Sequence, residues 1–431
     1  MTLRLSTPAQ RGVLLAAAFV TTLFLSYFSV RNAMAVHYSG LQTPQGFQRA
    51  VSLEPADARN WYLLGRYWQY NLEEPDAASA IRSYLSALSL DPGSAEIWLD
   101  LAAAYESESN LPAARDAFLH ARRAYPLSAE VAWRYGNFLL RQGELDPAFA
   151  EMRRAVEADP KRGAEALSRS LRVQPDLDAT LDRVLPPLSE AYLTAMRDQT
   201  AEGHTANALK IWNRLASIHP HFPLQDSFAL VSALVQGKRI DDARRVWDQA
   251  VVFSGLADLP ALPDSLLWDG GFESGVTGGG FAWIIPGGIR GVQIGFDSQV
   301  KHSGNRSLRL MFDGESNINF AGPCHYVPVQ PSTRYRFSAW IRTRALTTNQ
   351  GIRFQLHSIG TENSPVITTP DVHGTEPWTV IEVPWSSSSS VQQLQVCLAR
   401  FPSDESANKI QGTAWVDDVA LVPESAERPK P

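Results

Sequence analysis

Residues 98–126, WLDLAAAYESESNLPAARDAFLHARRAYP, are the stretch that decides the fold of the first half of this chain. Apolar residues recur in it at spacings of three and four, which predicts two short helices that each bury one stripe. Trp98, Tyr105 and Phe118 are expected to fill the space between these helices, and Pro126 to end the second one, because proline cannot donate the next hydrogen bond. A unit of this size cannot bury its apolar face alone, so neighbouring units are expected to stack on it.

The unit repeats along the chain. Pro92, Pro126 and Pro160 follow one another at intervals of 34 residues, and the apolar positions between them correspond. This pattern resembles the tetratricopeptide repeat, a helix–turn–helix unit of that length. The resemblance implies an all-α solenoid over residues 36–254, regular over 59–160 and degenerate over 161–254, whose concave surface binds a protein partner. The segment before Gln48 is predicted to be a linker, followed by a first partial helix at Gln48–Leu53.

The N-terminal region has a different composition. Residues 12–30 form a 19-residue run without a charge, which is just long enough to cross a hydrocarbon core as a helix. The apolar region of a signal peptide is usually shorter, so residues 1–35 are predicted to be a cytoplasmic stub and a retained transmembrane anchor. Arg4 and Arg11 precede the run, which favours a cytoplasmic start and an extracytoplasmic or periplasmic location for the rest. The small residues of Ala33-Met34-Ala35 leave the alternative of cleavage after Ala35 and secretion.

A β domain is predicted for the C-terminal part. Residues 255–265 are interpreted as a linker, residues 266–423 as an all-β jelly-roll sandwich, and residues 424–431 as a disordered tail. Short alternating segments separated by turn residues support the sandwich. The predicted strands are Ser307–Phe312, Tyr335–Thr343, Ile352–Ser358, Trp378–Pro384, Gln392–Ala399 and Thr413–Val422.

Four short motifs occur in order along this domain: Asp269-Gly270-Gly271-Phe272-Glu273, Ser303-Gly304-Asn305-Arg306-Ser307-Leu308, Val329-Gln330-Pro331-Ser332-Thr333-Arg334-Tyr335 and Ala414-Trp415-Val416-Asp417-Asp418-Val419. In this order and spacing they resemble carbohydrate-binding modules of the galactose-binding-like type. The resemblance implies a structural Ca²⁺ held by Glu273, Asp417 and backbone oxygens near Lys301, since calcium prefers oxygen ligands. The alternative is that both carboxylates only cap turns.

A glycan site is predicted from the alternation of side chains along three strands. Tyr335, Phe337 and Ile341 take one face of their strand, which leaves Trp340 on the other. An aromatic ring among amide, guanidinium and imidazole groups would suit a sugar cleft. The candidate residues are Trp340, Arg336, Arg342, Arg353, Gln355, His357 and Gln395. The alternative is that Trp340 packs beneath a loop or against the solenoid, because an outward aromatic residue can equally mark a protein contact.

Other features exclude several classes of function. The formal net charge of −6 argues against nucleic acid as a partner, because phosphate binding needs a basic surface. No catalytic motif is recognisable, so the chain is predicted not to be an enzyme; a glycoside hydrolase or lyase would require paired carboxylates in a cleft. Cys324 and Cys397 allow one disulfide bond in an exported protein, or two separate thiols.

The sequence therefore predicts a non-enzymatic, membrane-anchored scaffold of the cell envelope. Its repeats would bind protein partners and its sandwich a glycan, in polysaccharide assembly or export. The alternative is an assembly factor whose sandwich is purely structural or contacts another protein.

Overall fold

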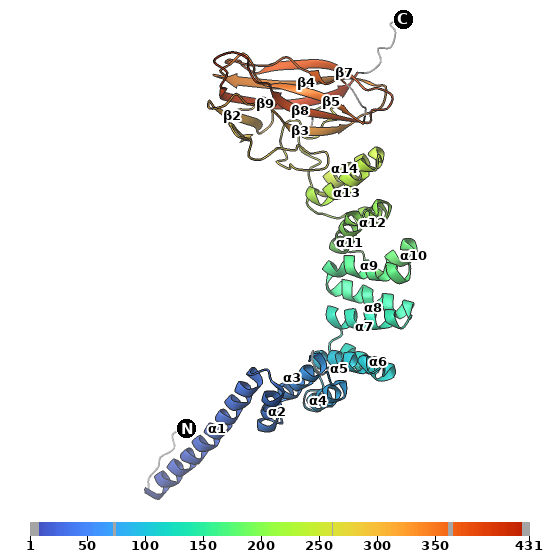
Figure 1. The fold of residues 1–431 in the computed structure, drawn as a ribbon, viewed down its shortest axis with the longest axis vertical. Helices are drawn as coiled ribbons and strands as arrows, with labels where there is room; N and C mark the ends of the chain where they lie inside the picture. Colours follow the sequence, from blue (N-terminus) through green and yellow to red (C-terminus); the bar gives the residue numbers. More distant parts are fainter. Residues whose placement is uncertain (1–7, 72–74, 261, 361–364, 425–431) are drawn as a thin grey trace. The chain divides into compact units, whose positions relative to one another are not determined.

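The computed structural model describes residues 8–71, 75–260, 262–360 and 365–424. Helices come first along the chain and a β-sandwich follows (Figure 1). The chain divides into two compact units, one of residues 1–162 and 166–186, the other of residues 163–165 and 187–431. The first seven residues of the predicted cytoplasmic stub lie outside the described part, as does the predicted tail beyond Glu424.

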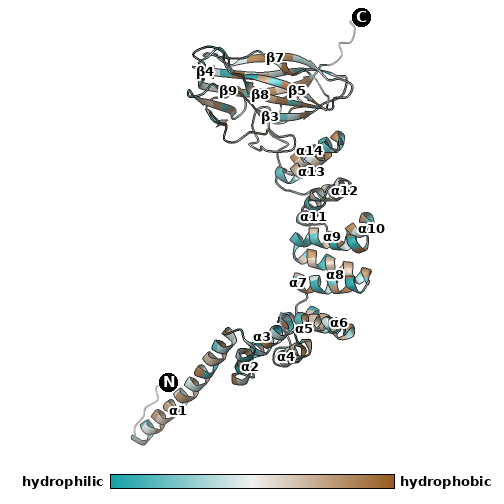
Figure 2. Ribbon diagram, viewed as in Figure 1, coloured by the Kyte–Doolittle hydropathy of each residue, from teal (hydrophilic) through white to brown (hydrophobic). Residues whose placement is uncertain are grey.

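The first helix, α1 (Pro8–Gly40), is long and apolar enough to cross a membrane, with a mean hydropathy of 2.1 over a window of which 0% is buried (Figure 2). Its C-terminal end packs against α2 (Pro44–Leu53), where Ala35 is buried and Arg31 pairs with Glu54 at 2.9 Å. The prediction of a linker before Gln48 is therefore wrong. The chain is helical to Gly40 and again from Pro44, because these residues bury an apolar stripe between the two helices.

Helical hairpins form over the regular repeats. They consist of α3 (Ala58–Tyr70) with α4 (Ala77–Leu90), α5 (Ala95–Ser107) with α6 (Leu111–Ala124), and α7 (Ala129–Arg141) with α8 (Leu145–Ala158). Ala102 and Ala114 are fully buried where α5 and α6 meet, and Phe118 stacks on Tyr135 of the next hairpin. Trp98 is half-buried and lies between the two helices as predicted: its ring stacks on His120 of α6 with 4.3 Å between ring centres, and its indole N–H donates to the Pro92 carbonyl at 2.9 Å.

The helical pattern continues less regularly after Pro160. The first unit contains η1 (Pro160–Arg162), most of α9 (Gly163–Val173) and α10 (Leu177–Val184). The second contains α11 (Ser189–Ala201), α12 (Thr205–Ser217), η2 (Leu224–Ser227), α13 (Phe228–Gln236) and α14 (Ile240–Phe253). Trp212 and Trp247 are buried among these last helices, as expected for large aromatic residues of a repeat core.

The β-sandwich consists of two antiparallel sheets. The five-stranded sheet has the order β1 (Val292–Asp297), β2 (Ser307–Asp313), β9 (Gln411–Pro423), β4 (Arg334–Arg344), β7 (Thr379–Ser386). The four-stranded sheet has the order β3 (Phe320–Pro328), β8 (Gln393–Arg400), β5 (Arg353–Ile359), β6 (Ile367–Thr368). All six predicted strands are present, and β1, β3 and β6 were missed. A bulge between Ala321 and Cys324 breaks the alternation of β3, which removed its sequence signal.

The core lies between the two sheets. Tyr335, Phe337 and Ile341 of β4 point into it, and so do Phe354 and Leu356 of β5. The predicted alternation along both strands is confirmed, because residues at every second position face the core. The intervening residues lie on the outer faces of the sandwich, where a binding site would be built.

Candidate functional site

The predicted glycan residues do not lie on one face. Trp340, Arg336 and Arg342 belong to β4 of the five-stranded sheet, whereas Arg353, Gln355, His357 and Gln395 belong to β5 and β8 of the four-stranded sheet. Outward residues of the two sheets point away from each other across the core. The prediction of a single site is therefore wrong. Alternation shows which residues of a strand face outward, but not which sheet the strand joins.

The outer face of the four-stranded sheet brings a polar set together in register. Gln395 of β8 lies between His357 of β5 and Tyr326 of β3, and the Gln395 side-chain amide donates to the Tyr326 hydroxyl oxygen at 2.9 Å. Gln355 lies one row along, opposite Cys397. We call Tyr326, Gln355, His357 and Gln395 the amide face. His357 is exposed and the other three are half-buried, so this surface is open to a ligand.

Arg353 stands at one end of the amide face and is held in place by three contacts. Its guanidinium donates to the Gln350 side-chain oxygen at 2.6 Å and pairs with Asp371 at 3.2 Å. It also lies 4.7 Å from the centre of the Phe401 ring. The guanidinium is thereby fixed beside the amides, with a side chain that is 13% exposed.

The chemistry of the amide face suits a neutral, hydroxyl-rich ligand. Side-chain amides both donate and accept, and a phenol adds a flat ring with one polar group. Tyr326 was missed by the sequence reasoning, because its strand was not recognised. Tyr326 lies two residues after Cys324, on the same face of its strand. This spacing would have placed it beside Gln395 only if the pairing of β3 with β8 had been known.

Cys324 and Cys397 are joined by a disulfide bond. They lie directly opposite each other in β3 and β8, one row from the Tyr326–Gln395 pair. The bond therefore ties together the two strands that carry this pair, across a sequence separation of 73 residues.

The environment of Trp340 on the other sheet is different. The His302 ring stacks on it with 4.0 Å between ring centres and an interplanar angle of 17°, and Trp378 contacts His302 from the side. Trp340 is half-buried beneath the loop between β1 and β2, which contains His302. One face of its ring is thus already occupied, which agrees with the alternative that it packs beneath a loop.

The proposed calcium ligands Glu273 and Asp417 form hydrogen bonds with the same loop, between β1 and β2. Glu273 accepts hydrogen bonds from the Asn305 backbone at 2.7 Å, and Asp417 accepts them from the backbones of His302 and Ser303 at 2.8 and 3.2 Å. Burial raises the pKa of the Asp417 carboxyl to about 6. An oxygen-only donor set suits calcium. However, both carboxylates already accept N–H groups, and the described residues contain no group of three His, Cys, Asp or Glu able to hold a metal. Calcium is compatible with this donor chemistry and is not needed to satisfy it.

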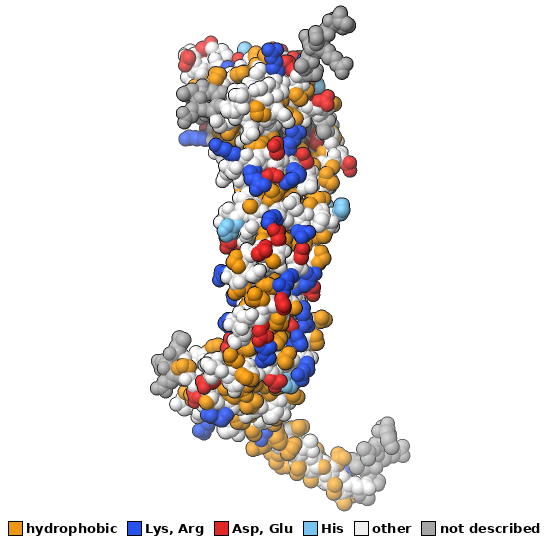
Figure 3. Space-filling model, turned by 90° about the vertical axis from the view of Figure 1, so that its right-hand side faces the viewer, with side chains coloured by type: hydrophobic (Ala, Val, Ile, Leu, Met, Phe, Trp, Pro, Cys, Tyr) orange, Lys and Arg blue, Asp and Glu red, His pale blue; other side chains and the backbone are white. Residues whose placement is uncertain are grey.

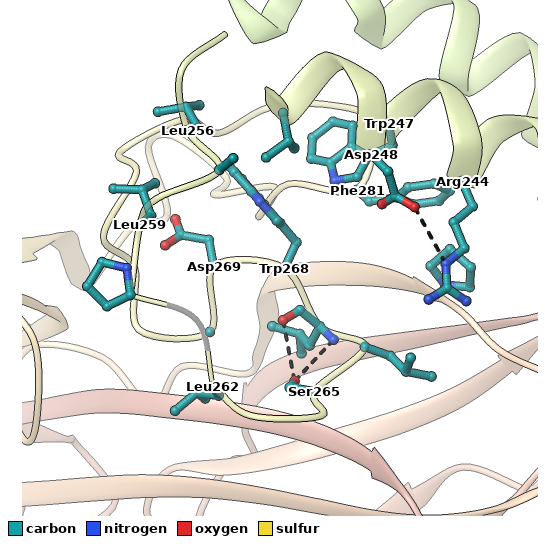
Figure 4. Close-up of a pocket in the computed structure, with 17 residues that line it drawn as sticks. Arg244, Trp247, Asp248, Leu256, Leu259, Leu262, Ser265, Trp268, Asp269 and Phe281 are labelled. Atoms are coloured by element: carbon teal, nitrogen blue, oxygen red, sulfur yellow. Dashed lines mark hydrogen bonds and ion pairs between the residues drawn. The ribbon is translucent and has the colours of Figure 1, made fainter. Parts of the chain in front are cut away.

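A pocket of about 230 Å³ lies between α14 and the opening turn of the sandwich (Figure 4). Its walls include Trp247, Trp268 and Phe281, and the segment predicted as a linker contributes Leu256 and Leu259. Two carboxylates also line it, but each has a partner of its own. Asp248 pairs with Arg244 at 3.9 Å, and Asp269 accepts from the hydroxyl of Ser274 at 2.6 Å.

A second pocket, of about 340 Å³, lies along helices α3, α5 and α7 of the regular repeats. Asp100 is buried there and accepts hydrogen bonds from the Tyr62 hydroxyl and from Arg134, each at 2.9 Å. Burial, helped by the charge of Asp100, raises the pKa of the Tyr62 hydroxyl, which therefore remains a donor. Arg66 completes the cluster at 3.8 Å from Asp100 and is half exposed.

Comparisons with known proteins agree with this organisation. The tetratricopeptide repeat family matches residues 72–126 and 109–163, so the N-terminal half contains tetratricopeptide repeats. No curated protein matches the chain.

Three solved structures show the kinds of fold that the two halves resemble. YrrB, a tetratricopeptide protein with an unusual peptide-binding site, is 17% identical over 49% of this chain and 94% of its own, with a TM-score of 0.26. TmCBM61, solved with β-1,4-galactotriose, is 17% identical over 37% of this chain and 99% of its own, with a TM-score of 0.27. The CBM22-1 xylan-binding domain of Paenibacillus barcinonensis Xyn10C is 15% identical over 33% of this chain and 86% of its own, with a TM-score of 0.26. At these identities the likeness concerns the fold alone.

Proposed function

We propose that this chain is a non-enzymatic, membrane-anchored scaffold of the cell envelope that binds a protein partner through its repeats and a neutral glycan through the amide face. The arrangement of Tyr326, Gln395 and His357 in one cross-strand row carries the glycan part of the proposal. These side chains offer donors, acceptors and a flat ring on a rigid sheet, as recognition of sugar hydroxyl groups requires.

The anchor is supported by α1, which is apolar and unburied over its membrane-length window. The rest of the chain would then lie outside the cytoplasm, where a disulfide bond persists. A mature N-terminus at Met1 or near it is expected on sequencing of the native protein. A mature protein that begins at Val36 would overturn the anchor.

The repeats supply the second binding surface. Repeat solenoids present concave surfaces to extended partners, and the pocket along α3, α5 and α7 offers exposed Arg66 beside buried Asp100. A partner segment seated here would contact residues of successive repeats, so binding should depend on the intact array.

The glycan part is tested with the full-length protein in nanodiscs of neutral lipid. Binding to neutral β-linked polysaccharides, including galactan and xylan, would be measured by calorimetry. The Gln395→Ala variant should bind at least fivefold more weakly, since one hydrogen bond contributes about 1 kcal/mol. Gln293→Ala is the matched control, because Gln293 is an exposed glutamine on β1 of the other sheet. Absence of binding by the folded wild-type protein would overturn the glycan part and leave the assembly-factor alternative.

Calcium belongs to the same proposal as a structural ion. Added Ca²⁺ should raise the melting temperature of the wild-type protein relative to a chelator, because a cation would compensate the buried Asp417 carboxylate. The Glu273→Gln/Asp417→Asn variant should show no such difference. Equal melting temperatures of the wild-type protein with calcium and with chelator would exclude the ion.

A further inference from the structure

Strand β4 carries four exposed arginines on the outer face of the five-stranded sheet. They alternate with core residues, so their side chains share one face on either side of Trp340. We call this set the arginine row: Arg334, Arg336, Arg342 and Arg344. At about 3.3 Å per residue the row extends over about 33 Å.

None of the four arginines forms an ion pair with a carboxylate in the part of the chain that the structure describes. Arginines of the helices behave differently: Arg115 pairs with Glu144, Arg122 with Glu151 and Arg141 with Glu106. Figure 3 shows basic and acidic side chains lying next to each other over the helical region. Several arginines of the repeats are thus neutralised by a nearby carboxylate, whereas the four of β4 have no such partner among the described residues, although the whole chain has a net charge of −6.

Two members of the row are held in place by a buried tryptophan. The guanidinium groups of Arg342 and Arg344 lie 5.9 and 5.4 Å from the centre of the Trp415 ring. Trp415 is itself fixed, because its indole N–H donates to Asp297 at 2.9 Å and its side chain is 3% exposed. A guanidinium stacked on an aromatic ring keeps its planar donor edge free for an anion.

No carboxylate forms an ion pair with the row in the described part of the chain, although Glu376 and Glu424 are exposed and lie beside it, where their backbones bond to Thr343 and Arg334. Asp297 is occupied by Trp415 and by Arg309 of β2, which pairs with it at 3.4 Å. Glu382 is exposed on β7, but it lies opposite Ser338. The surface thus combines positive charges that lack a described carboxylate partner with two guanidinium groups that lie over a buried indole ring.

We propose that the arginine row binds a linear, carboxylate-bearing polysaccharide of the polyuronate class. Arginine recognises carboxylates through its two parallel donors, and an extended row fits an extended polymer with repeated charges. Single-stranded nucleic acid is less suited, because Trp340 is covered by His302 and Trp415 is buried, so no ring is free to stack on bases. A membrane surface is disfavoured, because Val380 is the single large apolar side chain of β4 and β7 that the structure exposes.

This inference rests on the proposed polysaccharide role and names a second, charged ligand for a face that the neutral glycan does not use. The two proposals can fail separately. Loss of neutral-glycan binding in Gln395→Ala tests the amide face, and polyuronate binding tests the arginine row.

The experiment measures binding of polygalacturonate to the full-length protein in neutral-lipid nanodiscs at low salt. The Arg342→Gln/Arg344→Gln variant should bind at least tenfold more weakly, and Arg342→Lys/Arg344→Lys should keep part of the affinity. Arg59→Gln/Arg290→Gln is the matched control, because it removes two exposed arginines from other surfaces. Unchanged melting temperatures would show that each variant is folded.

Three results would overturn the proposal. One is wild-type affinity in Arg342→Gln/Arg344→Gln, and another is absence of polygalacturonate binding by the wild-type protein. The third is equal or tighter binding of anionic vesicles or single-stranded DNA, which would indicate a membrane or nucleic acid as the partner of this face.

Discussion

The two outer faces of the sandwich are built from the same alternating pattern and have opposite chemistry. The amide face carries neutral groups that bond to one another, such as Gln395 with Tyr326, beside a disulfide bond. The arginine row carries charges without described carboxylate partners, two of them resting on Trp415. The difference shows that one domain can carry two chemically distinct surfaces that are separated by its core.

The largest expected effect is the loss of stability on removal of the disulfide bond beside the amide face. Replacement of both Cys324 and Cys397 by alanine should lower the free energy of unfolding by about 4 kcal/mol, since the bond closes a loop of 73 residues. Denaturant unfolding of the variant measures this. Wild-type protein kept in reductant should show a similar loss, and no change in either sample would contradict the role of the bond. Polygalacturonate binding by the folded fraction should persist.

The next effect is a pH dependence of stability that originates in the four-stranded sheet. His325 of β3 is fully buried, and burial lowers the pKa of its imidazole from 6.5 to about 4. The unfolded chain therefore takes up a proton below pH 6.5 that the folded chain refuses, so the contribution of His325 to stability should fall by roughly 3 kcal/mol as the pH decreases to about 4. The raised pKa of Asp417 acts in the opposite direction over this range, so the effect of His325 is the difference between the wild-type protein and His325→Gln. The melting temperature of His325→Gln should therefore rise relative to that of the wild-type protein as the pH decreases from 6.5 to 4. An equally steep pH dependence in that variant would assign the effect to other groups.

Salt should separate the ligands of the two faces. Binding of polygalacturonate should weaken by about tenfold or more between 50 and 500 mM NaCl, because salt screens exposed charges. Binding of a neutral glycan to the amide face should change little over the same range. Calorimetry at the two salt concentrations tests this, and a salt-independent polygalacturonate affinity would contradict the electrostatic basis of the arginine row.

The smallest expected effect concerns one hydrogen bond of the amide face. Tyr326→Phe removes the acceptor for Gln395 and keeps the ring, so neutral-glycan binding should weaken by about fivefold, equivalent to about 1 kcal/mol. Polygalacturonate binding is the internal control and should be unchanged. A Tyr326→Phe variant with full glycan affinity would show that this pair does not position the ligand groups.

Much of the helical half could be predicted from the sequence. The 34-residue interval of Pro92, Pro126 and Pro160 indicates the repeat, because each unit places the same small and large residues where its helices meet. The N-terminal end of the array could not be predicted as well. Residues 31–40 carry no strong helix signal of their own, and they are helical because Ala35 packs on α2 and Arg31 pairs with Glu54.

In the sandwich, the sequence by itself determined which residues of β4, β5 and β8 face outward, because alternation is a local property of an extended chain. Only the tertiary structure decided which strands share a sheet, since that depends on hydrogen bonds between segments far apart in the chain. This pairing separated Trp340 from Gln355 and His357, and it placed Tyr326 of the unrecognised strand β3 beside Gln395. It also left the arginine row on a face of its own, which no periodicity along a single strand could show.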